Sequence, residues 1–175
     1  MPRILVDADS MPARHRAIIL RRAMKENIVT AFVADRRLGD VEDAMKAHTT
    51  ELRSPLRDTL GRDEIRKVRT TISMIVVESG ANAADDRIVE MSGPDCIVIS
   101  HDIPLLARAL EKGARAMDDR GGVYSSENIR VRLGERDVNS ILREMKVFED
   151  RSRPFDNKQL EAFANCLDRM LVNHT

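Results

Sequence analysis

The sequence predicts an α/β fold in which a mostly parallel sheet of about five strands lies between layers of helices. Two observations predict it. Short apolar runs rich in β-branched residues recur between residues 4 and 117, and most are followed by segments with helical periodicity. The runs are apolar almost throughout, which is typical of strands buried on both faces of a parallel sheet. This alternation favours a right-handed, doubly wound arrangement.

Each element follows from its local pattern. Strands are predicted at residues 4–6, 28–34, 72–78, 95–100 and 114–117, and helices at residues 12–26, 83–91 and 104–112. Between the second and third strands, residues 40–69 mix acids and bases evenly and include Pro55 and Gly61. We expect one or two short helices there, near residues 41–47 and 63–68, in a charged insertion.

The chain after residue 117 is predicted to be helical. One helix begins after Ser125 or Ser126, Gly134 is expected to break it, and a second helix continues to about residue 146. Residues 151–154 form the best candidate linker. Asp156, with a glutamine three residues later, resembles a capping box that starts a last helix. We therefore expect a domain over residues 1–150, with residues 151–175 adding a helix that packs on it.

Composition excludes some classes of protein. Lys and Arg number 29, as do Asp and Glu, so nucleic acid such as RNA would need a local basic patch. The candidate patches are Arg14/Arg16, Arg21/Arg22 and Arg66/Lys67/Arg69, although such clusters most often mark solvated helix faces. The longest apolar runs fall well short of the roughly 20 residues that span a bilayer, so no membrane partner is expected. The sequence pattern does not indicate which oligomeric state the protein adopts.

The two cysteines and the first residues of the sequence indicate in which cellular compartment the protein is expected. Cys96 lies in a predicted strand and Cys166 in a predicted helix, so both are expected to be buried thiols. The chain enters its first strand without a charged leader and a long apolar segment. We expect a cytoplasmic protein.

Acidic and polar side chains follow several predicted strands, and parallel strands bring such positions to one edge of the sheet. Asp7 and Asp9 follow the first strand, where alternation along an extended chain would point them the same way. Ser10 is predicted to cap the helix that begins near Pro12. The residues after later strands are Asn82, Asp85, Asp86, Ser100, His101, Asp102, Asp118 and Asp119.

Converging carboxylates imply a cation or shifted pKa values. Two unit charges about 4 Å apart repel by roughly 4 kcal/mol at an effective dielectric of 20. Oxygen ligands favour Mg²⁺ or Mn²⁺, and one or two such ions held by aspartates support phosphoryl chemistry. The competing interpretation is that these aspartates only cap helices, and for a single aspartate capping is the commoner role. Acids after at least three strands favour a site.

Five sequence blocks carry a family resemblance. They are ILVDADSMPA (4–13), SGANAADDRIV (79–89), VISHDIPLLARALEKGARA (98–116), RGGVYSSENI (120–129) and FANCLDRML (163–171). Together they resemble the YaiI/YqxD family of uncharacterised bacterial proteins. The resemblance implies a PIN-like, three-layer α/β/α fold related to metal-dependent ribonucleases. It also implies a Mg²⁺ or Mn²⁺ site at Asp7, Asp9, Asp85, Asp86 and Asp102.

The chain departs from the family pattern at several positions. Ser10-Met11 replaces the usual Ala-Cys before Pro12, which removes a thiol. Asn82 stands where an acid is usual, and Arg87 where an aromatic residue is usual. Residues 40–69 make the chain longer than is usual in the family between the second and third strands. This insertion could serve as a lid, as an oligomer contact or only as a filler loop.

The leading hypothesis is a Mg²⁺- or Mn²⁺-dependent nuclease acting on RNA. Asp7, Asp86 and Asp102 would hold the first ion and Asp9 and Asp85 the second or its waters. Asn82 would orient those waters, and Ser10 and Ser100 would contact phosphate; His101 alone is weak evidence. One alternative is a small-molecule phosphatase with Asp7 as nucleophile and Asp9 as acid/base; its only obvious phosphate-binding lysine is Lys112, which we expect at the far end of its helix, so this alternative is weaker. The other is a non-catalytic RNA- or protein-binding module.

Overall fold

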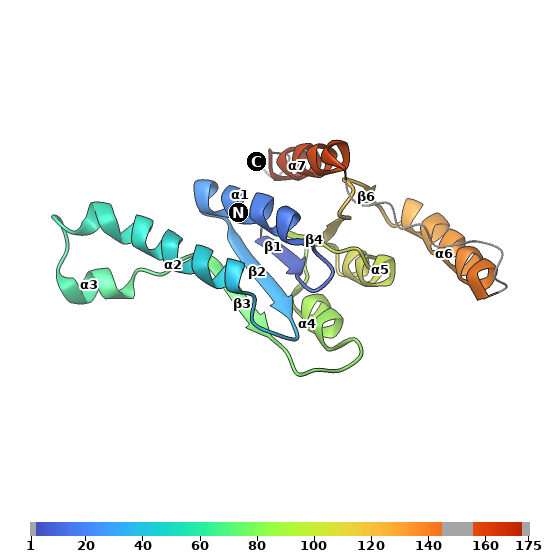
Figure 1. Cartoon of the computed structure of the whole chain (residues 1–175), viewed down its shortest axis with the longest axis horizontal. Coiled ribbons are helices and arrows are strands. Elements are labelled where there is room, and N and C mark those ends of the chain that lie inside the picture. The colour runs from blue at the N-terminus through green and yellow to red at the C-terminus, as the bar shows by residue number, and fades with distance from the viewer. Residues whose placement is uncertain (1–2, 145–155, 173–175) are drawn as a thin grey trace.

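A six-stranded sheet forms the centre of the molecule, seen in a computed structural model that describes residues 3–144 and 156–172 (Figure 1). The strands are β1 (Arg3–Asp7), β2 (Val29–Ala34), β3 (Ile72–Val76), β4 (Cys96–Ile99), β5 (Arg115–Met117) and β6 (Val123–Tyr124). Their order is β3-β2-β1-β4-β5-β6. The pairings among β1 to β5 are parallel, and β6 pairs antiparallel with β5. The predicted mostly parallel α/β sheet is confirmed.

Seven α-helices surround this sheet within the described residues. They are α1 (Ala13–Glu26), α2 (Gly39–Arg53), α3 (Arg62–Lys67), α4 (Ala83–Met91), α5 (Ile103–Glu111), α6 (Asn128–Glu144) and α7 (Asn157–Val172). A 3-10 turn, Ser54–Leu56, links α2 to the loop before α3. The far end of α2 and all of α3 project beyond the sheet (Figure 1).

Two apolar cores, one on each face of the sheet, hold the layers together. Alternate residues of β1 face opposite cores, because side chains alternate along a strand. Ile4 and Val6 pack with side chains of α1, α2 and α7. Leu5 packs with side chains of α4 and α5 and with Ile129 of α6. The helices are thus arranged as a three-layer fold with β1 at its centre.

The strand order creates a crevice at the carboxyl end of β1. From β1 the chain passes to β2 and β3 on one side, whereas β4 and β5 lie on the other. Ligands of open α/β sheets collect where the order reverses in this way. Asp7 ends β1, and Ser100 follows β4 directly. The sheet therefore places these two residues next to each other at this edge.

Several predicted elements differ from the structure. Gly134 does not end a helix, because α6 runs through it; glycine costs a helix about 1 kcal/mol but leaves its hydrogen bonds intact. The insertion holds a longer helix than expected, α2, and β6 was not predicted because two residues carry no periodicity. The predicted linker 151–154, and helix beyond residue 144, lie outside the described residues.

The start of α7 agrees with its predicted cap. The backbone N–H of Gln159 donates to a carboxylate oxygen of Asp156 at 2.8 Å. On the inner side of α7, Phe163 and Leu167 are fully buried in the core shared with α1. The inner side of α7 therefore packs in the same core as β1 and α1.

Candidate functional site

Asp7 is a buried carboxylate at the end of the central strand. Its residue is only 6% exposed, and one carboxylate oxygen accepts a 2.6 Å hydrogen bond from the Ser100 hydroxyl. Burial raises the pKa of Asp7 above its ordinary value of 3.8, the Ser100 and Ser10 hydroxyls lower it, and the negative charges of nearby carboxylates raise it again. A carboxylate in this position is destabilised unless a cation or a proton joins it.

Asp85 and Asp102 lie close enough to Asp7 to interact electrostatically. Asp85 is in the first turn of α4, and Asp102 is the N-cap of α5. Burial raises the pKa of Asp85, and the charges of Asp102 and Asp7 raise it further. Asp9 and Asp102 also raise the pKa of Asp7. The strands thus bring Asp7, Asp85 and Asp102, from distant parts of the sequence, near enough for their charges to act on one another, although in the part of the chain that the structure describes no three such side chains lie close enough to form a ligand set.

Asp9 is held by partners in the loop after β2, although its charge still raises the pKa of Asp7. The strand β1 ends at Asp7 and the chain turns, so the alternation that predicted a common direction stops there. One oxygen of Asp9 accepts a hydrogen bond from the Asp35 backbone N–H at 2.8 Å, and the other pairs with Arg36 at 3.4 Å. Asp9 therefore faces the loop after β2.

Asp86 and Asp102 are also paired with arginines. Arg108 of α5 lies 2.6 Å from Asp86, and Arg136 of α6 lies 3.0 Å from Asp102. These arginines carried no signal in the sequence, because their partners are 22 and 34 residues away and on other elements. They became recognisable only when the fold brought the helices together.

A network of hydroxyl groups joins the loops after β1 and β4. Contrary to the prediction, Ser10 does not cap α1, because the helix begins at Ala13 and its N-cap is Pro12. Its hydroxyl instead donates to the Asp7 carbonyl oxygen and accepts from the His101 backbone N–H. Ser100, fully buried, donates to the Asp7 carboxylate and accepts from the Asp102 N–H at 2.9 Å. Both serines hold the crevice in shape.

Asn82 occupies the N-cap of α4 in a left-handed conformation, with φ of 66°. Its side chain makes no capping hydrogen bond and is exposed. Asparagine tolerates this conformation better than most residues, so the backbone geometry at the start of α4 is enough to explain an asparagine at position 82.

The two aspartates after β5 have different roles. Asp118 closes the turn to β6, since it accepts hydrogen bonds from the backbone N–H groups of Arg120 and Gly122 and from the Tyr124 hydroxyl. Asp119 is buried, and its carboxylate lies 3.1 Å from Nδ1 of the exposed His101. His101 is thereby oriented at the edge of the crevice, by a partner that sequence alone did not identify.

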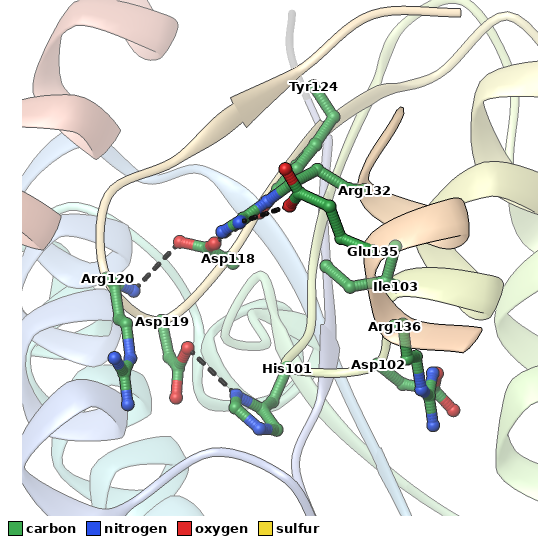
Figure 2. Close-up of a pocket in the computed structure, with 10 residues that line it drawn as sticks. All are labelled: His101, Asp102, Ile103, Asp118, Asp119, Arg120, Tyr124, Arg132, Glu135 and Arg136. Atoms are coloured by element: carbon green, nitrogen blue, oxygen red, sulfur yellow. Dashed lines mark hydrogen bonds and ion pairs between the residues drawn. The ribbon is translucent and has the colours of Figure 1, made fainter. Parts of the chain in front are cut away.

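A pocket of about 610 Å³ adjoins this group of residues (Figure 2). Its wall comes from the start of α5, the β5–β6 turn and the first turns of α6. Asp102 and His101 lie at the side nearest the crevice, and Arg132 and Arg136 line it from α6. The crevice and the pocket therefore share Asp102.

The donor chemistry of the crevice suits Mg²⁺ or Mn²⁺. Asp7, Asp85 and Asp102 offer only oxygens, and their mutual repulsion is what a divalent cation relieves. Within residues 3–144 and 156–172, no three Asp, Glu, His or Cys side chains are gathered closely enough to form a ligand set. The pairs with Arg136 and Arg108 hold Asp102 and Asp86 in other interactions. Across the same residues, none of the helices is both long and apolar enough to cross a membrane.

Comparison with known proteins identifies relatives along nearly the whole chain. The family model described as "Uncharacterized BCR, YaiI/YqxD family" matches residues 60–173. A UPF0178 protein of Burkholderia cenocepacia (strain HI2424) is 34% identical over 171 residues, covering 98% of this chain and 97% of that protein. A UPF0178 protein of Pseudomonas fluorescens (strain Pf0-1) is 31% identical over 170 residues, covering 97% and 95%. No solved structure matches.

The matched range divides the candidate residues. Asp7, Asp9 and Ser10 precede residue 60, whereas Asn82, Asp85, Asp86, Ser100, His101 and Asp102 lie within residues 60–173.

Proposed function

This chain belongs to the YaiI/YqxD family, and we propose that it is a Mg²⁺- or Mn²⁺-dependent hydrolase of phosphodiester bonds, a PIN-like nuclease acting on RNA in the cytoplasm. The observation that carries the proposal is the carboxylate group at the switch point of the sheet. Asp7 is buried there, the charges of Asp9 and Asp102 raise its pKa, and the charges of Asp102 and Asp7 raise the pKa of Asp85. Repelling carboxylates at the ligand-binding edge of an α/β sheet favour a catalytic site.

Each candidate residue receives a role from its position. Asp7, Asp85 and Asp102 would hold one cation, with Asp9 and Asp86 available to a second cation or its waters once released from their arginines. A bound cation would supply an activated water and stabilise charge on the leaving oxygen. Ser100 keeps Asp7 oriented through its 2.6 Å hydrogen bond. Ser10, His101 and Asn82 border the crevice and would contact the phosphate or its water shell.

The phosphatase alternative finds no support in the position of its lysine. Lys112 is the C-cap of α5, whereas Asp102 is the N-cap of the same nine-residue helix. A helix of that length separates its ends by about 13 Å. Lys112 therefore lies far from the carboxyl edge, and Asp7 has no nearby lysine from this helix to bind a phosphate.

Two measurements on one set of variants test the proposal. Mn²⁺ binding is measured by calorimetry, and hydrolysis of bis(p-nitrophenyl) phosphate and of single-stranded RNA is followed with Mn²⁺ present. We expect Asp7→Asn to weaken Mn²⁺ binding at least tenfold and to lower both hydrolysis rates at least a hundredfold. Asp63→Asn, on the exposed surface of α3, is the matched control and is expected to behave as wild type.

Circular dichroism spectra of the variants establish that the fold is kept. Wild-type hydrolysis by Asp7→Asn would refute the assignment of the site. Mn²⁺ binding that depends on Asp7, without hydrolysis of any phosphodiester, would instead favour the non-catalytic module.

A further inference from the structure

Three arginines pair with aspartates near the carboxylate group, and each comes from a different element. Arg36, from the loop after β2, lies 3.4 Å from Asp9 and 3.4 Å from its neighbour Asp35. Arg108 of α5 lies 2.6 Å from Asp86. Arg136 of α6 lies 3.0 Å from Asp102. We call Arg36, Arg108 and Arg136 the arginine rim.

The pairs of the arginine rim are exposed and exchangeable. The arginine side chains are 66%, 42% and 53% exposed, and their aspartate partners 30%, 66% and 35%. Ion pairs in such surroundings contribute little to stability, so a competing ion of either sign can replace a partner at low cost. A cation on the aspartates and an anion on the arginines would satisfy both sets at once.

The arginine rim has the chemistry of a phosphate-binding surface. A guanidinium binds phosphate oxygens in a bidentate manner and stays charged at any physiological pH. Arg36 follows the end of β2 and Arg136 lies on α6 beyond β5, whereas Arg108, in the last turn of α5, reaches toward the edge to pair with Asp86 in the first turn of α4. The strands β2, β1, β4 and β5 alone cover three spacings of about 4.8 Å, or about 14 Å. This is longer than one phosphate group and suits a chain of them.

The pocket beside Asp102 extends this surface. Arg136 belongs to both, and Arg132 lies one helical turn before it on α6. Arg132 pairs with Glu135 at 3.1 Å, and both side chains are about half exposed. Two acids of the pocket, Asp118 and Asp119, are buried, and their carboxylate oxygens already take part in hydrogen bonds within the protein. A nucleic-acid strand leaving the crevice past Asp102 would thus meet Arg132 in addition to Arg136 of the rim.

The same surface offers few aromatic groups to nucleobases. Of the Phe and Tyr side chains in the described part of the chain, Phe32, Phe163 and Tyr124 are all buried. Base stacking on such rings normally supplies much of the affinity of proteins for single strands. Binding here would depend on phosphates instead, and would therefore be tolerant of sequence and sensitive to salt.

From these contacts we infer that the arginine rim is the substrate-binding surface for a single-stranded nucleic acid, gripped through several consecutive phosphates across the carboxyl edge. The inference rests on the proposed function for the identity of the substrate but not for the binding itself. In the unbound protein each rim arginine is held by an aspartate. When the nucleic acid binds, its phosphates replace the aspartates as partners of these arginines.

The test measures binding without metal or turnover. Fluorescence anisotropy of a labelled RNA octamer is followed in EDTA, with the Asp102→Asn variant as the background, because Arg136 there has lost its carboxylate partner. Adding Arg136→Gln is expected to weaken octamer binding about tenfold, and adding Arg36→Gln and Arg108→Gln as well to weaken it at least a hundredfold. The slope of log affinity against log salt should fall by about 0.7 for each arginine removed.

A matched control distinguishes a specific role of the rim arginines from the general effect of removing one positive charge. Lys46 on α2 is also exposed and, like Arg132, pairs with an acid three positions away. Lys46→Gln in the same background should leave octamer binding unchanged. Competition by a mononucleotide, by inorganic phosphate and by an unlabelled octamer then shows how binding depends on the length of the nucleic acid. We expect the octamer to compete at least a hundredfold better than either small anion.

Four results would overturn the inference. These are a wild-type protein that binds no octamer at low salt, rim variants that bind as their parent does, an equal loss in Lys46→Gln, and small anions that compete as well as the octamer. Hydrolysis of bis(p-nitrophenyl) phosphate needs no strand-binding surface, so it reports on the proposed function separately. A protein that hydrolyses this ester but fails the octamer test keeps its proposed chemistry and loses its proposed substrate surface.

Discussion

Asp7 and Asp118 are both aspartates at the carboxyl end of a parallel strand, and they are buried to the same degree, at 6% and 7% exposure. Their surroundings differ. Asp118 receives two backbone N–H groups and the Tyr124 hydroxyl, which together satisfy its charge. The Asp7 carboxylate receives the Ser100 hydroxyl and faces other negative charges.

The contrast separates a structural carboxylate from a candidate ligand. A buried charge that is fully hydrogen-bonded stabilises the structure around it, and removing it leaves its donors unpaired. A buried charge with too few donors among like charges destabilises the fold until something binds. Burial alone is therefore a poor guide to function at this edge of the sheet, whereas the balance of donors and charges is informative.

The largest expected effect on stability follows from removing Asp118. Asp118→Ala would leave the N–H groups of Arg120 and Gly122 and the Tyr124 hydroxyl without their partner. We expect a loss of about 3 kcal/mol in the free energy of unfolding, measured by urea denaturation. Asp63→Ala on α3 serves as the exposed control and should change stability by less than about 0.5 kcal/mol. A loss below about 1 kcal/mol in Asp118→Ala would contradict the structural role.

A glycine in the same turn provides the next test. Gly121 has φ of +83°, and a Cβ atom there would lie 2.7 Å from the carbonyl oxygen of Ala162 in α7. Gly121→Ala is expected to lower the free energy of unfolding by about 2 kcal/mol, because the left-handed backbone and the contact with α7 both resist a side chain. Thermal unfolding monitored by circular dichroism measures the change.

The control for Gly121 is the glycine inside α6. A Cβ atom at Gly134 would meet no neighbouring group within 4 Å, and the backbone there is helical. Gly134→Ala should therefore raise stability by up to about 1 kcal/mol. If both substitutions changed stability in the same direction, the turn would not be the constrained contact that the geometry indicates.

The smallest expected effect has the opposite sign and lies at Asp7. Because the pKa of Asp7 is raised in the folded protein, the folded state binds more protons than the unfolded state between pH 3.8 and that raised pKa. Stability therefore falls as the pH rises through this window. Asp7→Asn removes the penalty, and in metal-free buffer at pH 7 we expect it to be more stable than wild type by about 1 kcal/mol, or 2–4 °C in Tm.

The pH dependence distinguishes this cause from a packing change. The difference in Tm between Asp7→Asn and wild type should shrink as the pH falls through the raised pKa and vanish below about pH 3.8, where Asp7 is protonated in both states. A difference that stayed constant from pH 7 to pH 3 would mean that the charge of Asp7 is not the cause.

Much of the framework could be predicted from local patterns in the sequence. Residues 28–34 are mostly apolar and rich in β-branched side chains, a pattern typical of a strand buried between two helix layers. The structure has β2 at Val29–Ala34. Asp7, Asp85 and Asp102 were predicted to share an edge because each follows a parallel strand. Their charges do interact. These features depend on periodicity and chain direction, which are local properties.

The tertiary structure decided which of these acids are paired and which are not. The direction of Asp9, the arginine partners of Asp86 and Asp102, and the turn closed by Asp118 depend on contacts between elements far apart in the sequence. A side chain that is long and flexible, such as arginine, carries no periodicity that reveals its partner. The sequence by itself thus determined where negative charge gathers, and only the fold determined what surrounds that charge.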